Sequence, residues 1–371
     1  MQKENRCFII FYKMKLNDQQ KFALRQKISD YSKELGFDLV GFSKAKIDNK
    51  YLREFEKWLK NGYEADMSYM QKIEQRADLG KILPGAKTVI VLGMNYYHEQ
   101  GALPRGHARV AKYAYGRDYH KVIGKKLKEL EKFIGELMDA KSPPDKKSKN
   151  SRRLDMGITK AYVDTGPILE RAFAEQSGLG RIGKNGCLIT EKFGSWIFLA
   201  EIITTLDLNL KSSPIKPFPG TESPSRWSDP SQKPFNICGN CTRCLKACPT
   251  GAIIAPGIID SRLCISYLTI ENKNKISSHL AKIIKKTKRI FGCDICQEVC
   301  PHNKARSRAS KNQELFTPKI AGDSLNIKTL CPKNFPKKFP VISDLQFLKI
   351  FAGSPLMRAK RKGLQRNAKI L

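Results

Sequence analysis

The sequence predicts an α+β protein with a mixed helix-and-strand first domain, a small cysteine-rich second domain and a basic C-terminal region. Three observations predict this organisation. Amphipathic helices and short apolar strands alternate up to about residue 208. A proline- and serine-rich stretch, 209–236, then interrupts the pattern and is expected to be a linker or surface loop. Eight of the 11 cysteines follow between Cys238 and Cys300, a distribution typical of a metal-cluster domain.

The overall composition excludes several classes of protein. The chain has 371 residues, 41% of them hydrophobic, and a formal net charge of +33. This composition does not fit a collagen, a disordered chain or a membrane protein, and no apolar run approaches the length of a transmembrane helix. The apolar stretch from Cys7 to Tyr12 is too short for a signal peptide. We therefore expect a cytoplasmic protein in which residues 1–15 form an N-terminal extension, with Met14 as an alternative start.

The first domain is expected over residues 16–208, on the basis of hydrophobic periodicity. A capped amphipathic helix is predicted at 17–36, where Gly36 ends it. The later elements are a strand at 37–43, a buried strand at 87–96, a charged helix at 117–139, a strand that runs into a helix start at 161–167, and an apolar strand at 194–205.

The cysteines form a pattern that is typical of two iron–sulfur clusters. The first run, C-x2-C-x2-C-x3-C-P, begins at Cys238, and the second half has a lone cysteine followed by C-x2-C-x3-C-P. In two-cluster ferredoxins, the fourth cysteine of a run binds the other cluster. This exchange predicts one [4Fe–4S] cluster on Cys238, Cys241, Cys244 and Cys300, and a second on Cys248, Cys264, Cys293 and Cys296. Structural zinc, the alternative, usually has paired C-x2-C or mixed Cys/His ligands. The remaining cysteines are expected to be ordinary thiols, namely Cys7, Cys187 and Cys331.

The segment 163–186 is the candidate active-site segment, and Asp164 has two interpretations within it. Asp164 or Thr165 can cap the helix that follows, with Pro167 in the first turn. A capping carboxylate is ionised, and the helix dipole lowers its pKa. A proton donor must instead be protonated near neutral pH, which requires burial that raises the pKa. From these residues alone, the cap is favoured.

A glycine-rich stretch, GLGRIG at 178–183, lies in the same segment. It matches a dinucleotide-binding pattern but follows a helix instead of a strand, so we do not interpret it as such a site. Gly178 is expected at the end of the helix, and the glycines are expected to let the backbone lie close to a flat ligand. Arg181 and Lys184 either meet phosphate or carboxamide groups of that ligand or are ordinary surface charges.

The stretch YAYGRDYH at 113–120 combines aromatic residues with Asp118 and His120. The spacing D-x-H-x3-G to Gly124 falls one residue off the D-x-H-x2-G cobalamin motif, so His120 is not expected to bind cobalt. A structural histidine with satisfied hydrogen bonds is the favoured interpretation.

The basic residues are clustered along the chain, which favours a polyanionic partner over a uniform compositional bias. Residues 272–290 hold seven Lys or Arg and no acidic residue, while 332–371 hold ten and one acidic residue. The loop 141–153 is also basic. Clusters of this kind are typical of a nucleic-acid footprint.

Taken together, these segments resemble the epoxyqueuosine reductase family of iron–sulfur and cobalamin enzymes, over about residues 17–305. The matching stretches are LPGAKTVIVLGMNYY, YAYGRDYHKVIGKKL, VDTGPILERAFAEQSGLGRIGKN, FGSWIFLAEI, CGNCTRCLKACPTGAI, RLCISYLTIE and GCDICQEVCPHN, with a weaker match at GSPLMRAKRKGLQRNA. The resemblance implies a nitroreductase-like, corrinoid-binding catalytic domain over 16–208. A ferredoxin-like domain over 237–305 would supply its electrons.

The resemblance also implies the reaction and its residues. The family removes the epoxide oxygen of epoxyqueuosine at the wobble position of a tRNA by two-electron reduction, giving queuosine. Asp164 matches the family's proton donor, and a corrin against it would raise its pKa. The implied cobalamin contacts are Arg76, Tyr113, Ala114, Asp164, Lys184 and Thr190.

The implied partners are a tRNA with a queuosine-type anticodon and an unidentified low-potential electron donor. The chain is expected to be a monomer with no membrane association. Its basic C-terminal region, 306–371, is expected to be helical and to contact tRNA, whereas 141–153 and 209–236 look like insertions relative to the family. Two other functions remain open: a dehalogenase-like corrinoid reductase and a non-catalytic ferredoxin-type electron carrier.

Overall fold

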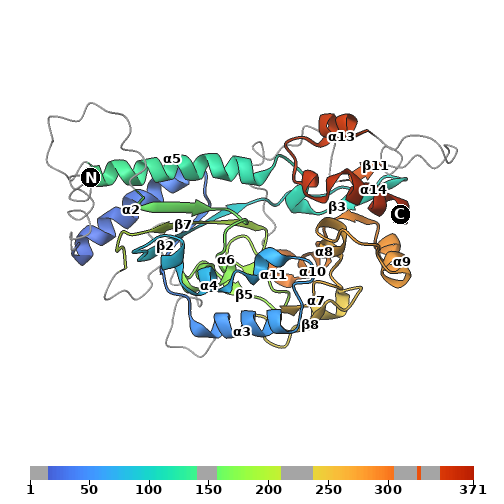
Figure 1. The fold of residues 1–371 in the computed structure, drawn as a ribbon, viewed down its shortest axis with the longest axis horizontal. Helices are drawn as coiled ribbons and strands as arrows, with labels where there is room; N and C mark the ends of the chain where they lie inside the picture. The colour runs from blue at the N-terminus through green and yellow to red at the C-terminus, as the bar shows by residue number, and fades with distance from the viewer. Residues whose placement is uncertain (1–15, 140–156, 210–236, 305–323, 327–342) are drawn as a thin grey trace.

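The computed structural model describes residues 16–139, 157–209, 237–304, 324–326 and 343–371. The first domain is built on a four-stranded antiparallel sheet in the order β1-β2-β7-β4. Its strands are β1 (Leu39–Lys44), β2 (Thr88–Asn95), β7 (Ile197–Thr204) and β4 (Thr159–Tyr162). Helices α2 (Asp18–Glu34) and α5 (Tyr119–Asp139) cover one face, and α6 (Glu170–Gln176) lies against the other (Figure 1).

Strand β2 is buried on both faces because its apolar residues alternate between two cores. Ile90, Leu92 and Met94 pack in the core that α2 and α5 cover. Val89 and Val91 point the other way and pack in the core that contains Phe173 of α6. A strand buried on both sides has a continuous apolar sequence, and the buried strand predicted at 87–96 is confirmed.

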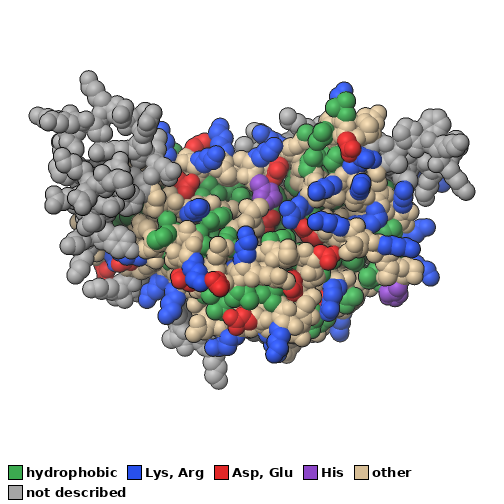
Figure 2. Space-filling model, in the orientation of Figure 1, with side chains coloured by type: hydrophobic (Ala, Val, Ile, Leu, Met, Phe, Trp, Pro, Cys, Tyr) green, Lys and Arg blue, Asp and Glu red, His purple; other side chains and the backbone are tan. Residues whose placement is uncertain are grey.

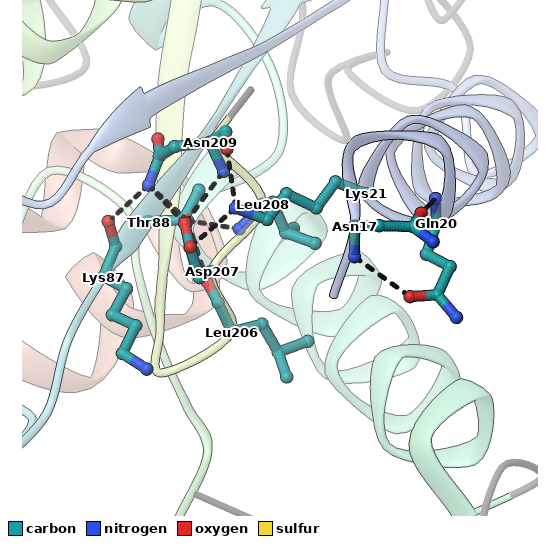
Figure 3. A network of polar contacts seen from close by, with 9 residues as sticks. All are labelled: Asn17, Gln20, Lys21, Lys87, Thr88, Leu206, Asp207, Leu208 and Asn209. Carbon is teal, nitrogen blue, oxygen red and sulfur yellow. Dashed lines mark hydrogen bonds and ion pairs between the residues drawn. The ribbon is translucent and has the colours of Figure 1, made fainter. Parts of the chain in front are cut away.

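Helix α2 begins and ends close to the predicted limits. Asn17 and Gln20 form a capping box at its start, and Gly36 follows its end with φ +91°, a left-handed conformation that favours glycine. Lys21 is buried within the first turn, and its ammonium lies 2.6 Å from a carboxylate oxygen of Asp207 (Figure 3). This contact ties the helix to the segment that follows β7.

The first domain also contains several short elements. They are α3 (Asn49–Lys60), η1 (Ser68–Gln71), α4 (Ile73–Ala77), η2 (Leu79–Lys81), η3 (Lys112–Ala114), β5 (Arg181–Ile182) and β6 (Leu188–Ile189).

The cysteine-rich region lies beside the sheet and shares structure with the first domain (Figure 1). Its elements are α7 (Arg243–Ala247), β8 (Ile253–Ala255), β9 (Ile258–Ile259), α8 (Ile265–Ile270), α9 (Ser278–Thr287), β10 (Arg289–Phe291), α10 (Ile295–Glu298) and α11 (Pro301–Lys304). Strand β3 (His107–Val110) comes from the first domain, yet it pairs with β10 and with β11 (Ser324–Asn326). The boundary expected at residue 208 therefore separates the chain less completely than the sequence suggests.

The end of the chain is helical, as expected, and packs on this shared sheet. Its elements are α13 (Asp344–Phe351), η5 (Pro355–Ala359) and α14 (Lys360–Ile370). Asn367 is fully buried, and its amide donates to the carbonyl oxygens of Thr269 and Ile290 at 2.8 and 2.9 Å. These bonds join α14 to both α8 and β10.

Several expectations are corrected or lie outside the described residues. The strand at 161–167 was expected to run into a helix, but β4 ends at Tyr162 and α6 begins only at Glu170, so Pro167 is not in the first turn of that helix. The extension 1–15, the loop 141–153 and nearly all of 209–236 lie outside the described residues, as does most of 306–342. None of the described helices is long and apolar enough to cross a membrane.

Candidate active site at Asp164

Asp164 lies in the loop between β4 and α6 and does not cap a helix. The residue that precedes α6 is Leu169, and no side chain caps that helix. Asp164 has φ +59°, which is unusual for a residue other than glycine. Its Oδ2 atom accepts a hydrogen bond from the Tyr119 hydroxyl at 2.7 Å and lies 3.4 Å from Nε2 of His120. The cap favoured from the sequence is therefore wrong, and the carboxylate belongs to a cluster of polar side chains.

His120 lies between two carboxylates. Its Nδ1 atom is 2.8 Å from Oδ1 of Asp118, and its other ring nitrogen faces Asp164. Burial acts to lower the pKa of His120, but the hydrogen bonds and charges of Asp118 and Asp164 outweigh it and raise the pKa to about 9. The imidazole is therefore protonated at neutral pH, and a histidine interpreted from sequence as structural is part of the site.

Asp164 is ionised in this arrangement. The protein atoms packed around its carboxyl act to raise the pKa, but the hydrogen bonds from His120 and Tyr119 and the charge of His120 lower it below the ordinary value. The side chain is still 60% exposed, so a ligand can reach it. The rise in pKa that a corrin would cause remains a prediction, because it depends on burial by that ligand.

The C-terminal segment reaches the same site. The carbonyl of Gly353 accepts a hydrogen bond from the backbone N–H of Asp118 at 2.7 Å. Arg358 donates two hydrogen bonds to the carboxylate of Glu271, at 2.8 and 3.1 Å, and its guanidinium lies 5.8 Å from the ring centre of Tyr69. The charge of Arg358 also lowers the pKa of Asp164. Sequence reasoning missed Arg358, although it lies in the weakly matching stretch at 353–368.

Arg76 is a buried guanidinium with unused donors. It is 4% exposed, and its Nε and Nη1 atoms are buried without a hydrogen-bond partner among the described residues. The guanidinium lies 5.6 Å from the ring centre of Phe55, and its pKa is lowered by burial although the charge of Glu170 opposes this. Unsatisfied buried donors are costly, so Arg76 fits a ligand that carries amide, phosphate or carboxylate oxygens.

The other predicted cobalamin contacts differ in whether they face the Asp164 site or are already hydrogen-bonded elsewhere. Tyr113 and Ala114 lie in η3, and burial together with the charge of Asp164 raises the pKa of Tyr113 well above its ordinary value. Tyr113 is therefore near the Asp164 site. Lys184 is occupied, because its ammonium donates to the carbonyls of Gly239 and Cys241 at 2.7 and 3.0 Å. It holds the cysteine loop instead of facing an open site.

Thr190 and the glycines of 178–183 are used in local packing. The Thr190 hydroxyl is buried and bonds to the carbonyl of Gly194 at 2.9 Å. A Cβ atom at Gly180 would lie 2.5 Å from the carbonyl oxygen of Ile189, so this glycine permits close packing of β5 on β6. Gly180 thus has a packing role of its own, and the expectation that these glycines let the backbone lie close to a flat ligand stays a prediction. Gly178 does follow α6 with φ +81°, as predicted.

The thiols of the cysteine-rich region fall into two electrostatic groups. Apart from burial, the pKa of the Cys244 thiol is raised by Cys238 and Cys300, and the pKa of Cys300 is raised by Cys238 and Cys241. In the second group, the pKa of Cys264 is raised by Cys248 and the pKa of Cys293 is raised by Cys264. The pKa of Cys296 is raised by both Cys293 and Cys264. Among the described residues, no group of three or more His, Cys, Asp or Glu side chains is arranged to hold one metal ion. A cubane presents four separate iron corners, so its ligands do not have to converge on one ion.

These features define a class of protein: an α+β iron–sulfur protein with a carboxylate–imidazolium site beside its cysteine-rich region. Family models support each half. The model described as Epoxyqueuosine reductase QueG, DUF1730 matches residues 76–165, and a 4Fe-4S double cluster binding domain matches residues 237–303. The chain therefore carries a domain for two [4Fe–4S] clusters.

Known proteins identify the family. The chain is 38% identical over 348 residues to an epoxyqueuosine reductase of Gloeobacter violaceus, covering 92% of this chain and 94% of the relative. An epoxyqueuosine reductase solved with an epoxyqueuosine-modified tRNA-Tyr stem loop superposes with a TM-score of 0.71 at 28% identity, covering 94% of this chain and 81% of that one. The Bacillus subtilis enzyme, solved with its catalytic aspartate loop swung out of the active site, gives a TM-score of 0.71 at 27% identity over the same shares. The chain belongs to the epoxyqueuosine reductase family.

Proposed function

We propose that this chain removes the epoxide oxygen of epoxyqueuosine in tRNA and thereby forms queuosine. One observation carries the proposal: an accessible carboxylate, Asp164, is hydrogen-bonded to Tyr119 and to protonated His120 in a family member with a double-cluster domain. Conversion of an epoxide to an alkene and water consumes two electrons and two protons. The cluster domain is suited to the electrons and the Asp164 site to the first proton, while the second proton, which completes the water molecule, comes from solvent.

In this proposal, Asp164 protonates the departing oxygen and His120 supplies the proton. The proton rests on the imidazole in the ligand-free arrangement, 3.4 Å from Oδ2 of Asp164. A bound substrate excludes water from the exposed side of Asp164, and loss of water disfavours the ionised pair. The proton then moves to Oδ2, while the Tyr119 hydroxyl holds the carboxyl in place.

We further propose that the first domain is a nitroreductase-like fold that binds cobalamin. When bound, cobalamin supplies a low-valent cobalt able to attack or reduce an epoxide carbon. Arg76 would bind polar groups of the corrin through its unused donors, and Tyr113, Ala114 and Asp164 would line the site. The side chains of Lys184 and Thr190 are engaged elsewhere, so their contact would come from the neighbouring backbone.

The two groups of thiols support the proposed ligand sets of the clusters. Cluster one would use Cys238, Cys241, Cys244 and Cys300, and cluster two would use Cys248, Cys264, Cys293 and Cys296. The fourth cysteine of each run then binds the cluster of the other run, as in two-cluster ferredoxins. An unidentified low-potential donor would reduce these clusters.

A basic surface supports tRNA as the substrate. Lys and Arg side chains gather in Figure 2 over the part of the molecule formed by α9, α13 and α14. The exposed cations of α9, α14 and the segments beside α9 are Lys273, Lys275, Lys282, Lys285, Lys286, Lys288, Lys360, Lys362 and Lys369. Arg358 lies in η5, two residues before Lys360 at the start of α14, and its charge acts on Asp164. Phosphates lying on this surface would place an anticodon nucleotide close to Asp164.

We also propose that the protein is a cytoplasmic monomer. Its catalytic domain would span 16–208, its cluster domain 237–305 and its tRNA-contacting region 306–371. A dehalogenase-like reductase needs no basic surface, and an electron carrier needs no proton donor. Membership of the epoxyqueuosine reductase family supports neither alternative.

The proposed function is tested by anaerobic reconstitution with iron, sulfide and cobalamin. A low-potential chemical reductant and an epoxyqueuosine-containing anticodon stem-loop are added, and the nucleosides are analysed by mass spectrometry. We expect loss of the epoxide oxygen only when cobalamin and reductant are both present. An unchanged stem-loop with a fully reconstituted protein would contradict the proposal, and turnover without cobalamin would contradict the cofactor.

A further inference from the structure

Asp164 is held in its unusual backbone conformation by Glu170. The Oε1 atom of Glu170, the first residue of α6, accepts a hydrogen bond from the backbone N–H of Asp164 at 2.8 Å. A left-handed conformation is unfavourable for residues other than glycine and persists only where surrounding contacts fix it. The bond from Asp164 to Glu170 is such a contact, and the direction of the Asp164 carboxylate depends on it.

Glu170 in turn faces a second carboxyl group that is completely buried. Glu201 is 0% exposed and lies on the central strand β7, opposite Val91 of β2 and Tyr162 of β4. Among the described residues, neither of its carboxylate oxygens has a hydrogen-bond donor. The groups that act on it are the neighbouring carboxyl group of Glu170 and the charge of Asp164. Two carboxyl groups can share a hydrogen bond only if one of them carries a proton.

The electrostatic surroundings favour that proton. Burial and repulsion from Asp164 raise the pKa of Glu170 to about 8, and burial with repulsion from Glu170 raises the pKa of Glu201 well above its ordinary value. The charged or titratable groups around Glu170 are Asp164, Glu201, Arg171 of its own helix, Arg76 of α4 and Tyr119 of α5.

The two guanidinium groups that act on Glu170, those of Arg171 and Arg76, form no ion pair with it in the described part of the chain. The Arg171 guanidinium donates to the carbonyl of Gly186 and acts on Glu170 only weakly compared with burial. The carboxyl pair therefore has no close salt-bridge partner in the described part of the chain that could replace the proton.

We propose that Glu170 and Glu201 are positioning residues that share a proton between α6 and β7 and so hold the Asp164 loop in its reactive conformation. Neither residue touches the substrate in this proposal, which rests on the proposed role of Asp164. Glu201, fixed in the sheet, donates the shared proton to Glu170. Glu170, fixed by that bond, accepts from the Asp164 N–H and turns the carboxylate toward Tyr119 and His120.

The first test compares Glu170→Ala with Glu170→Gln. The alanine variant loses the acceptor for the Asp164 N–H, whereas the glutamine variant keeps an acceptor without a charge. In anaerobically prepared protein with both clusters, hydrogen–deuterium exchange of the peptide containing Asp164 should become at least about tenfold faster in Glu170→Ala and remain unchanged in Glu170→Gln. The kcat should fall about ten- to a hundredfold in the alanine variant with little change in KM, because a misdirected catalytic group lowers the rate more than binding.

The matched control is Glu175→Gln on the same helix, because that carboxylate pairs with Arg181 at 3.7 Å and has no bond to the Asp164 loop. It should leave both the exchange and the kcat unchanged. If Glu170→Ala exchanges and turns over like the unaltered protein, the proposal is overturned. It is equally overturned if Glu170→Gln is as impaired as Glu170→Ala, since that result requires a carboxyl that transfers a proton.

The second test concerns Glu201. Glu201→Gln keeps a donor for Glu170 and should preserve exchange and kcat, while Glu201→Ala should accelerate exchange at the Asp164 loop. Unchanged exchange in Glu201→Ala would show that Glu170 holds the loop alone and would contradict the shared proton. The exchange measurement needs no turnover, so failure of the proposed reaction is distinguishable from failure of this inference.

Discussion

At the scale of single residues, the candidate site contains three charged side chains, one cation between two anions. Protonated His120 lies between the carboxylates of Asp118 and Asp164, and the Tyr119 hydroxyl donates to Asp164. The imidazolium stabilises both carboxylates as ions, so the proton rests on His120 until the surroundings change. A site of this kind holds a proton next to a general acid without requiring the acid to be protonated in the free protein.

Replacement of Asp164 by asparagine removes the proton donor and keeps the shape of the side chain. We expect Asp164→Asn to retain both clusters and bound cobalamin but to lose turnover by a factor of about 10² to 10⁴, the usual contribution of a general acid. The measurement is nucleoside mass spectrometry after single-turnover incubation, with iron and cobalamin contents determined on the same sample. Normal turnover would remove Asp164 from the mechanism.

His120 predicts a pH dependence of stability. Its pKa is about 9 in the folded protein, above the ordinary value of about 6.5 that applies when the chain is unfolded. The folded state therefore binds this proton more tightly. The stabilisation is complete below about pH 6.5 and is lost as the pH rises through about 9. Because the imidazole is partly exposed, we expect about 1 kcal/mol.

The measurement is the urea midpoint of the anaerobic protein at pH 6, 7.5 and 9, compared with that of His120→Gln. The difference in urea midpoint between the two proteins should shrink as the pH rises. Other groups also titrate in this range, but their effects cancel in the comparison. A difference that stays constant from pH 6 to 9 would mean that the His120 ion pairs do not contribute to the folding free energy.

At the scale of elements, local sequence predicts regular structure well and the active-site loop poorly. The periodicity of α2 and the apolar run of β2 are local signals, and both elements form where expected. The loop after β4 contains Asp164, Gly166 and Pro167, which resemble the start of a helix. The loop instead folds back on β4, where a Cβ atom at Gly166 would lie 2.6 Å from the Tyr162 ring. The carboxylate of Asp164 accepts a hydrogen bond there from Tyr119, 45 residues earlier in the chain, and no local pattern reveals that contact.

Helix α9 permits a test of the RNA surface at this scale. Lys285 and Lys286 are exposed in its last turn, and α14 packs beside it. Replacing both lysines by alanine should weaken binding of the modified stem-loop by about 1–2 kcal/mol and lower the slope of log affinity against log salt by up to about 2. Fluorescence anisotropy at several salt concentrations measures both quantities.

The matched control for α9 is the pair Lys57 and Lys60, which are exposed in the last turn of α3, a helix drawn at the bottom of the molecule and apart from α9 (Figure 1). Their replacement by alanine removes the same charge but should leave the affinity almost unchanged. Equal losses in the two variants would indicate attraction by net charge alone and would contradict a defined RNA surface on α9.

At the scale of the whole molecule, segments that are far apart in the sequence pack together near the site. Strand β3 of the first domain pairs with β10 of the cysteine-rich region, and Arg358 near the C-terminus acts on Asp164. The cysteine pattern predicts pairing between its two halves because ferredoxin spacing is a local and specific motif. The place of Arg358 and the shared β3 sheet depend on tertiary packing, which no spacing in the sequence encodes.

The proposed exchange of cysteines between the two halves can be tested with a double variant. If Cys248 and Cys264 bind the same cluster, Cys248→Ala, Cys264→Ala and the double variant should each lose one cluster and retain about four of the eight irons. If each run instead binds its own cluster, the two cysteines belong to different clusters and the double variant loses both. Iron and sulfide analysis, with electron paramagnetic resonance of the reduced protein, separates these outcomes. Cys187→Ala is the control. Burial raises the pKa of this thiol to about 11, and it lies close enough to act on cysteines of both groups. Because Cys187 belongs to neither proposed ligand set, the variant should retain both clusters.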